Sequence, residues 1–160
     1  MENLLSKESV KRVLKVLNDF DKSIKVENLD TSARTAKDAA KSLKTEIGSI
    51  VKSLLLRRQS SFLLCLVAGD KRCSLNKIKK ILNQKDVSMA NADQVKEITG
   101  FTIGGVSPVG HLKPIKIFID ISLSRFGNIF AAAGHPNCIF KINFEDLKKI
   151  TNGEVMDICE

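Results

Sequence analysis

The sequence has no tryptophan and no tyrosine, and phenylalanine supplies all 8 of its aromatic side chains. Proteins that bind nucleic acid by stacking bases on rings usually carry more aromatic residues than this. The apolar runs are all far shorter than the roughly 20 residues that cross a bilayer as a helix. The first residues also lack the basic-then-apolar order of a secretion signal. We therefore expect a cytoplasmic protein that makes no membrane contact.

Metal-ligating residues are scarce as well. There are 4 cysteines and 2 histidines, and no two cysteines form a C-x-x-C pair. A zinc site therefore has little support, and we expect neither a metal nor another cofactor. Cys65 and Cys138 stand inside apolar runs, which predicts buried free thiols in a reducing cytosol.

What the chain does contain fits one globular domain. It has 160 residues, of which 43% are hydrophobic and 28% charged, so we expect a single domain over 1–160. The net charge of +8 favours a polyanionic partner, although it is also compatible with a generic basic surface.

The apolar spacing mixes helical and alternating segments without a regular βαβ rhythm. A first helix is predicted over about 6–20, with Ser6 as its cap. Further helices are predicted after the caps Thr35, Ser74 and Asn143, and a short helix that contains Ala92 is predicted to end at Gly100. Strands are predicted at 24–29, 62–68, 101–106, 115–122, 128–133 and 138–142. Segment 50–57 is compatible with a helix end that continues as a strand. This mixture predicts an α+β fold with a mixed, barrel-like β-sheet flanked by short helices.

Lys52 is the first residue with chemical potential. It stands in the otherwise apolar segment 50–56, where on a strand it would share a face with Leu54 and Leu56. An ammonium on an apolar face is costly unless an anionic or polar group meets it. Lys52 is thus either a functional cation or a lysine whose head group reaches solvent at a strand end.

The segment Gly104 to Gly110 is the second feature, with three glycines and one proline in seven residues. Its backbone N–H groups could surround an anion or a developing oxyanion. The spacing does not match a nucleotide-binding P-loop, and a simple tight turn is the other interpretation. His135, in the turn 134–137, could donate a hydrogen bond or relay a proton, or could merely face solvent.

A basic stretch is the third feature. Five positive charges fall within ten residues, at Lys71, Arg72, Lys77, Lys79 and Lys80. They could contact a phosphate backbone or form an ordinary solvated helix face.

Taken in order, several stretches resemble a known family. They are 35–40, 47–54, 69–72, 99–111, 119–120 and 132–137. With them the chain, over roughly 24–158, resembles the YbaK/EbsC (ProX-like) aminoacyl-tRNA editing proteins, relatives of the editing domain of bacterial prolyl-tRNA synthetase.

The resemblance implies a deacylase that acts in trans on the ester of mischarged tRNA. It assigns catalytic roles to Lys52, Gly104, Gly105, Ser107 and Pro108. It assigns substrate contacts to Thr35, Gly110, Asp120, Gly134 and His135, and the five basic residues above would hold the tRNA acceptor end. Lys52 would act as a fixed positive charge, and the loop N–H groups would stabilise the oxyanion.

The substrate stays open among small amino acids. Relatives that act on Cys-tRNA(Pro) tend to have a tyrosine before the first core helix, and segment 29–35 has none here. Ala, Ser and Thr therefore stand beside Cys, on tRNA(Pro) or a related tRNA. We expect a monomer or weak homodimer, with prolyl-tRNA synthetase as a candidate partner. The alternative is a catalytically silent module that binds tRNA or a synthetase.

Overall fold

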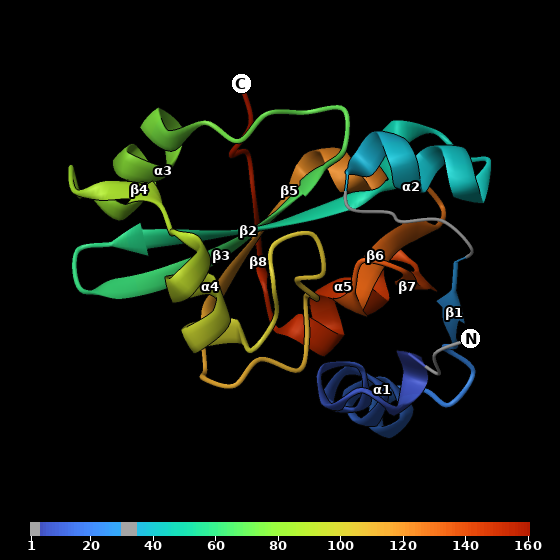
Figure 1. Ribbon diagram of the computed structural model, residues 1–160. Coiled ribbons are helices and arrows are strands. Elements are labelled where there is room, and N and C mark those ends of the chain that lie inside the picture. The colour runs from blue at the N-terminus through green and yellow to red at the C-terminus, as the bar shows by residue number, and fades with distance from the viewer. Residues whose placement is uncertain (1–3, 30–34) are drawn as a thin grey trace.

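The helices begin where polar side chains cap an apolar stripe. In the computed structural model, which describes residues 4–29 and 35–160, Thr35, Ser74 and Asn143 each accept a hydrogen bond from the backbone N–H three residues later, as predicted. Ser6 instead lies in a short 3-10 turn, and Lys7 takes the N-cap position of the first helix. The helices are α1 (Glu8–Phe20), α2 (Ala36–Leu43), α3 (Leu75–Leu82), α4 (Ala92–Thr99) and α5 (Phe144–Thr151) (Figure 1).

The strands form two sheets that mix parallel and antiparallel pairing. The larger sheet has the order β4-β2-β3-β5-β8, with β3 parallel to β5, β5 parallel to β8, and the remaining pairs antiparallel. Its strands are β2 (Val51–Arg58), β3 (Ser61–Ala68), β4 (Val87–Met89), β5 (Lys116–Asp120) and β8 (Glu154–Met156). The smaller, antiparallel sheet has the order β1-β7-β6, from β1 (Val26–Asn28), β6 (Ile129–His135) and β7 (Cys138–Ile142). A single parallel bridge between Ile50 and Phe130 links the sheets, so the α+β prediction is confirmed without a closed barrel among the described residues.

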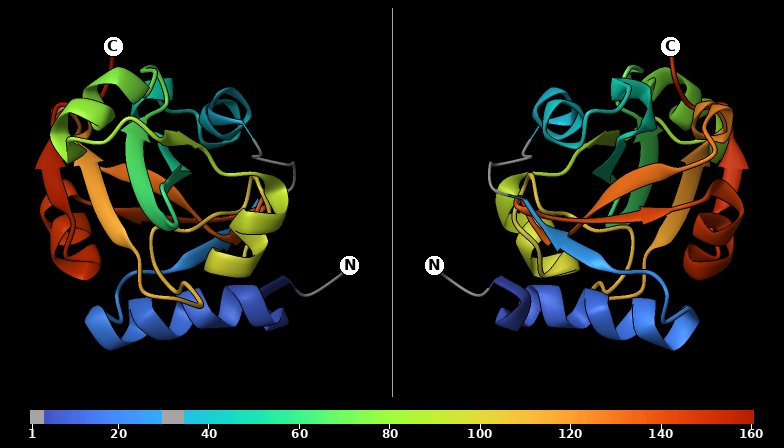
Figure 2. Two further views of the ribbon diagram at one scale, coloured as in Figure 1. Left: turned by 90° about the vertical axis from the view of Figure 1, so that its left-hand side faces the viewer. Right: turned by 90° about the vertical axis from the view of Figure 1, so that its right-hand side faces the viewer.

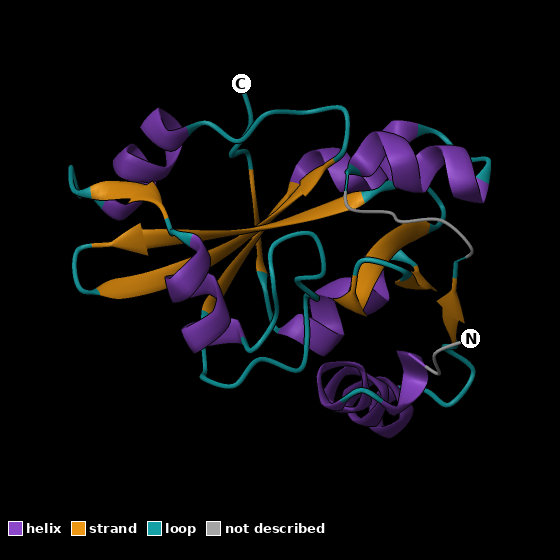
Figure 3. Ribbon diagram, in the orientation of Figure 1, coloured by secondary structure: helices purple, strands orange, loops and turns teal. Residues whose placement is uncertain are grey.

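One predicted strand is wrong. Residues 101–106 form part of an irregular loop between α4 and β5, drawn as a coil in Figure 3. Phe101 and Val106 are buried, and they gave the segment its strand-like apolar pattern, but they anchor a loop to the core instead. Two three-residue strands, β4 and β8, carry too little pattern to be predicted from sequence.

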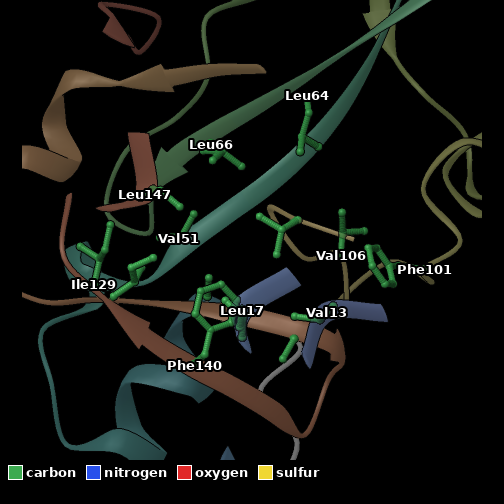
Figure 4. Close-up of a cluster of buried hydrophobic side chains, with 14 of the residues drawn as sticks. Val13, Leu17, Val51, Leu64, Leu66, Phe101, Val106, Ile129, Phe140 and Leu147 are labelled. Atoms are coloured by element: carbon green, nitrogen blue, oxygen red, sulfur yellow. The ribbon is translucent and has the colours of Figure 1, made fainter. Parts of the chain in front are cut away.

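The main core lies between the two sheets and α1. Val13 and Leu17 of α1 meet Leu64 and Leu66 of β3 and Phe140 of β7 (Figure 4). A second apolar cluster covers the other face of the larger sheet, beneath α3 and the C-terminal segment. As Figure 2 shows, α1 runs along the outside of the molecule beside the long loop. No helix in the described part of the chain is long and apolar enough to cross a membrane.

Candidate active site

A cavity of about 330 Å³ opens where β2 has no partner strand on one edge. β4 pairs with β2 only at 56–58, and the Ala90 N–H donates to the Leu55 carbonyl. At the other end, Ile50 bridges to Phe130. The edge of β2 between these points borders the cavity. The cavity is lined by Thr35, Ala36, Ala39, Ile50, Val51, Lys52, Ser53, Leu54, Leu55, Met89, Ala90, Val95, Ile103, Gly104, Val106, Ala132 and Ile139.

Lys52 lies in the wall of this cavity, and its ammonium has a polar partner at an exposed position. Its register opposite Val67 brings it to the end of β3, where its Nζ donates to the Lys71 carbonyl. One neutral carbonyl leaves two ammonium protons for another acceptor. Lys52 therefore lines the apolar cavity, and its ammonium is held at an exposed position next to Lys71.

The turn that holds Lys52 is itself fixed by an ion pair. Both Asp70 carboxylate oxygens accept from the Arg125 guanidinium, at 2.9 and 2.7 Å. This bidentate hydrogen bonding lowers the pKa of Asp70. Because Asp70 adjoins Lys71, the pair restrains the carbonyl that binds the Lys52 ammonium.

The loop after α4 forms the wall across from Lys52 and carries unused donors. Gly104 and Val106 line the cavity, and their backbone N–H groups have no hydrogen bond to any described residue. The Gly105 N–H, in contrast, donates to the Thr102 carbonyl at 2.9 Å. The backbone N–H groups that could bind an anion are therefore those of Gly104 and Val106. These two residues flank Gly105, which was also expected to supply a donor.

Gly105 lies close to His135, the last residue of β6. A Cβ at Gly105 would lie 3.0 to 3.1 Å from the backbone atoms of His135, tighter than almost all real contacts. Gly134, one residue earlier, packs against α1. The predicted turn 134–137 is shorter than expected, because Gly134 and His135 belong to the end of β6. The structure brings the loop and this strand end together, but neither Gly134 nor His135 lines the cavity.

The remaining loop residues of the prediction lie behind the cavity wall. Ser107 is fully buried, and its Oγ accepts from the Val109 N–H while its carbonyl bonds to His111 Nε2 at 2.7 Å. Pro108 and Gly110 border a separate surface hollow next to His111. These residues shape the loop and do not reach the cavity.

Two expected substrate contacts differ in their placement. Thr35 lies at the cavity, where its Oγ1 caps α2 by accepting from the Asp38 N–H. Asp120 does not reach the cavity: it is 1% exposed, and its carboxylate accepts from the backbone N–H groups of Ser122 and Ile158. Burial favours a raised pKa for Asp120, but these hydrogen bonds outweigh it, so the pKa is lowered. Asp120 fastens the C-terminal segment to β5.

The basic residues differ in whether their side chains are already paired with another part of the protein. Lys77 donates to the Asp157 carboxylate at 2.9 Å and to the Cys159 carbonyl at 2.6 Å, so it holds the C-terminal segment. Arg72 pairs loosely with Glu160. The side chains of Lys79 and Lys80, in contrast, have no hydrogen bond or ion pair to a described residue.

The cysteines behave as buried thiols. Cys65 and Cys138 are fully buried, as predicted. Cys65 shares a hydrogen bond with Cys73, which raises the pKa of Cys65 and lowers that of Cys73. Burial, with the Asp120 carboxylate, raises the pKa of Cys159 to about 12. Among residues 4–29 and 35–160, no group of three or more His, Cys, Asp or Glu could hold a metal ion.

Sequence reasoning missed the walls that give the cavity its size. Ala36 and Ala39 of α2 and Ala132 of β6 line it, together with Val95 of α4. These elements are far apart in sequence, so their meeting is a tertiary result. The one signal in the sequence was that these faces carry small alanine side chains, which leave space where larger apolar side chains would fill it. The segment 30–34, where the tyrosine is lacking, lies outside the described residues.

Comparisons with known proteins show the family to which the chain belongs. The family profile described as "Aminoacyl-tRNA editing domain" matches residues 30–150. The chain is 29% identical over 154 residues to "Uncharacterized protein YwhH" of Bacillus subtilis, a match that covers 95% of this chain and 98% of that relative. It is 29% identical over 133 residues to a proline--tRNA ligase of Bacillus licheniformis, covering 77% of this chain but 23% of the ligase.

Solved structures share the fold over nearly the whole chain. One, described as a "putative trans-editing enzyme for prolyl tRNA synthetase", has a TM-score of 0.90 and 35% identity, and covers 96% of this chain and 98% of its own. Another, described as "hypothetical protein APE2540", has a TM-score of 0.86 and 25% identity, covering 93% of this chain and 99% of its own. Both matches are too long to leave out α1, which precedes the segment matched by the family profile.

Proposed function

This chain belongs to the family of aminoacyl-tRNA editing domains, and from that premise we propose that it hydrolyses the ester of mischarged tRNA in trans. The observation that carries the proposal is one apolar cavity lined by Lys52 and by Gly104 and Val106, whose backbone N–H groups have no hydrogen bond to a described residue. An aminoacyl ester is already activated, so the protein has to place a water molecule and stabilise the tetrahedral oxyanion.

In the proposed reaction, water attacks the ester carbonyl and the terminal ribose hydroxyl of the tRNA leaves. The carbonyl oxygen gains negative charge as the tetrahedral intermediate forms. The Gly104 and Val106 N–H groups donate to that oxygen, where a single such donor contributes about 3–4 kcal/mol in known enzymes. Lys52 binds the terminal phosphate or the carbonyl as a fixed positive charge, held in place by Lys71.

The cavity walls favour a small amino acid. Ala36, Ala39 and Ala132 bring backbone close to the space without filling it, and Ile139 and Val95 limit its extent. Ala, Cys, Ser and Thr are therefore the candidate amino acids, chosen by size as in double-sieve editing. Similarity to proline--tRNA ligases supports tRNA(Pro) as the carrier, prolyl-tRNA synthetase as a partner, and the cytoplasm as the site of action.

A panel of mischarged tRNAs tests the proposal. We expect the wild type to deacylate at least one of Ala-, Cys-, Ser- and Thr-tRNA(Pro) while sparing Pro-tRNA(Pro). Lys52→Ala should lose this activity because the ammonium at the rim is gone, and thermal stability should be unchanged or improved. The matched control is Lys141→Ala, which removes an exposed strand lysine from β7.

The outcomes separate the two function classes. Deacylation that survives in Lys52→Ala at the wild-type rate contradicts the assigned role of Lys52. A wild type that binds tRNA(Pro) but hydrolyses none of the esters supports the alternative, a catalytically silent binding module. A large loss of melting temperature in Lys52→Ala, with activity kept, indicates a structural lysine.

A further inference from the structure

We propose that Arg12, on the N-terminal helix, is a positioning residue that fixes both ends of the active-site loop. The inference rests on the proposed deacylase function, because it concerns the loop that carries the Gly104 and Val106 donors. Helix α1 precedes residues 30–150, the segment matched by the editing-domain profile. The proposal therefore gives α1 a role in catalysis beyond covering the core.

The Arg12 guanidinium binds two carbonyls that lie ten residues apart. Its Nε donates to the Gly110 carbonyl and its Nη2 donates to the Gly100 carbonyl, each at 3.1 Å. Gly100 ends α4 and Gly110 ends the glycine-rich segment 104–110, so the two bonds lie on either side of the residues that carry the Gly104 and Val106 donors. Charge-assisted hydrogen bonds in a partly buried place are among the stronger ones in proteins.

The surroundings of Arg12 are shaped to receive it. A Cβ at Gly100 would lie 2.3 Å from Arg12 Nη2, and a Cβ at Gly110 would lie 3.2 Å from the Arg12 backbone. The guanidinium carbon also stands 5.0 Å from the centre of the Phe101 ring, a cation–π contact with a buried loop anchor. Both terminal glycines of the loop thus leave room for this one side chain and its helix.

Two backbone bonds hold the loop beyond Gly110, where the Leu112 and Lys113 N–H groups donate to the Thr99 and Ile98 carbonyls at 3.2 Å each. No sheet ladder holds the residues before them, so Arg12 restrains a stretch that lacks regular pairing. Between α4 and β5 the chain forms no strand, and its internal hydrogen bonds are few, such as the one from the Gly105 N–H to Thr102. Oxyanion donors contribute only if they are fixed before the charge develops. A planar guanidinium fork can hold two carbonyls at once, whereas a lysine ammonium presents one point of attachment.

Arg12→Lys and Arg12→Ala test the proposal in the full-length protein. On the aminoacyl-tRNA that the wild type hydrolyses fastest, we expect kcat to fall about tenfold or more in both variants, with KM little changed, because small displacements of catalytic groups are costly. Low millimolar guanidinium chloride should partly restore Arg12→Ala, while sodium chloride at equal ionic strength should not. Lys15→Ala is the control, since it removes an exposed charge from the same helix.

Hydrogen–deuterium exchange gives a readout that does not depend on activity. Amides of residues 102–109 should exchange faster in Arg12→Lys than in the wild type and in Lys15→Ala. Arg12→Lys keeps the aliphatic stem and the charge, so it tests the proposal even where Arg12→Ala does not fold. Retained kcat within about twofold with unchanged loop exchange overturns the inference. A wild type without deacylase activity refutes the proposed function instead, and loop exchange alone then decides for or against Arg12.

Discussion

At the scale of single residues, His111 holds the loop together from within, close to Arg12 of α1. Its imidazole Nε2 bonds to the Ser107 carbonyl, and its ring meets Phe101 edge to face with the centroids 6.0 Å apart. Burial lowers the pKa of His111, and the nearby Arg12 guanidinium lowers it further, against the opposing effect of the Ser107 hydrogen bond. The folded protein therefore keeps this histidine neutral at pH values where the unfolded chain would protonate it.

This difference predicts a specific pH dependence of stability. Because the folded pKa lies below the ordinary histidine value of 6.5, the contribution of His111 is complete above about pH 6.5 and is lost as the pH falls toward the folded pKa. Urea unfolding between pH 7 and 5 should show this loss, and His111→Gln, which keeps a donor for Ser107, should flatten the slope. The carboxylates with lowered pKa, such as Asp70, titrate below their ordinary value of 3.8, so they leave this window unaffected. An equal slope in the variant contradicts the assignment.

At the scale of elements, the site depends on how closely the loop meets the β6–β7 turn. Gly105→Ala places a Cβ 3.0 to 3.1 Å from the His135 backbone, so the loop or the turn has to move by a few tenths of an ångström. We expect turnover to fall about tenfold in Gly105→Ala, and further in Gly105→Val, with an unchanged circular dichroism spectrum. Gly127→Ala is the control, because a Cβ there meets nothing within 4 Å.

The result for Gly105 separates two roles for the loop. Normal turnover in both variants removes the loop from the active site. Loss of turnover together with a collapsed spectrum shows that the contact with His135 is needed for folding instead.

The elements also show where sequence information is sufficient. Helix starts were predictable because caps such as Ser74 and Asn143 are local, and β5 was predictable from its alternation. The loop after Gly100 was wrongly predicted because Phe101 and Val106 are buried for tertiary reasons.

Of the candidate site, Lys52 and Gly104 could be singled out because a lysine among apolar residues and a glycine-rich turn are local anomalies. The alanine walls and Arg12 could not, since their roles arise only when distant elements meet.

At the scale of the whole molecule, the lysines that contribute to the net charge of +8 differ in whether they already bind another part of the protein. Lys77 is 41% exposed at its side chain but is bonded to Asp157 and to the Cys159 carbonyl. Neutralising it would loosen the C-terminal segment as well as remove a charge. A test of tRNA binding on α3 therefore has to use Lys79 and Lys80, which are free of such bonds within the described residues.

The double variant Lys79→Gln, Lys80→Gln is expected to bind tRNA more weakly than the wild type. If both side chains bind phosphates, the slope of log affinity against log salt should flatten by about two units, one for each phosphate that is no longer neutralised. The order in which amino acids are removed should stay the same, because that selection belongs to the cavity between Lys52 and Gly104. The control removes two charges elsewhere whose side chains have no ion pair to a described residue, with Lys141→Gln in β7 and Lys149→Gln in α5. Unchanged affinity and salt slope in the α3 variant would move the tRNA footprint elsewhere, and Arg58 beside β4 would be the next surface to test.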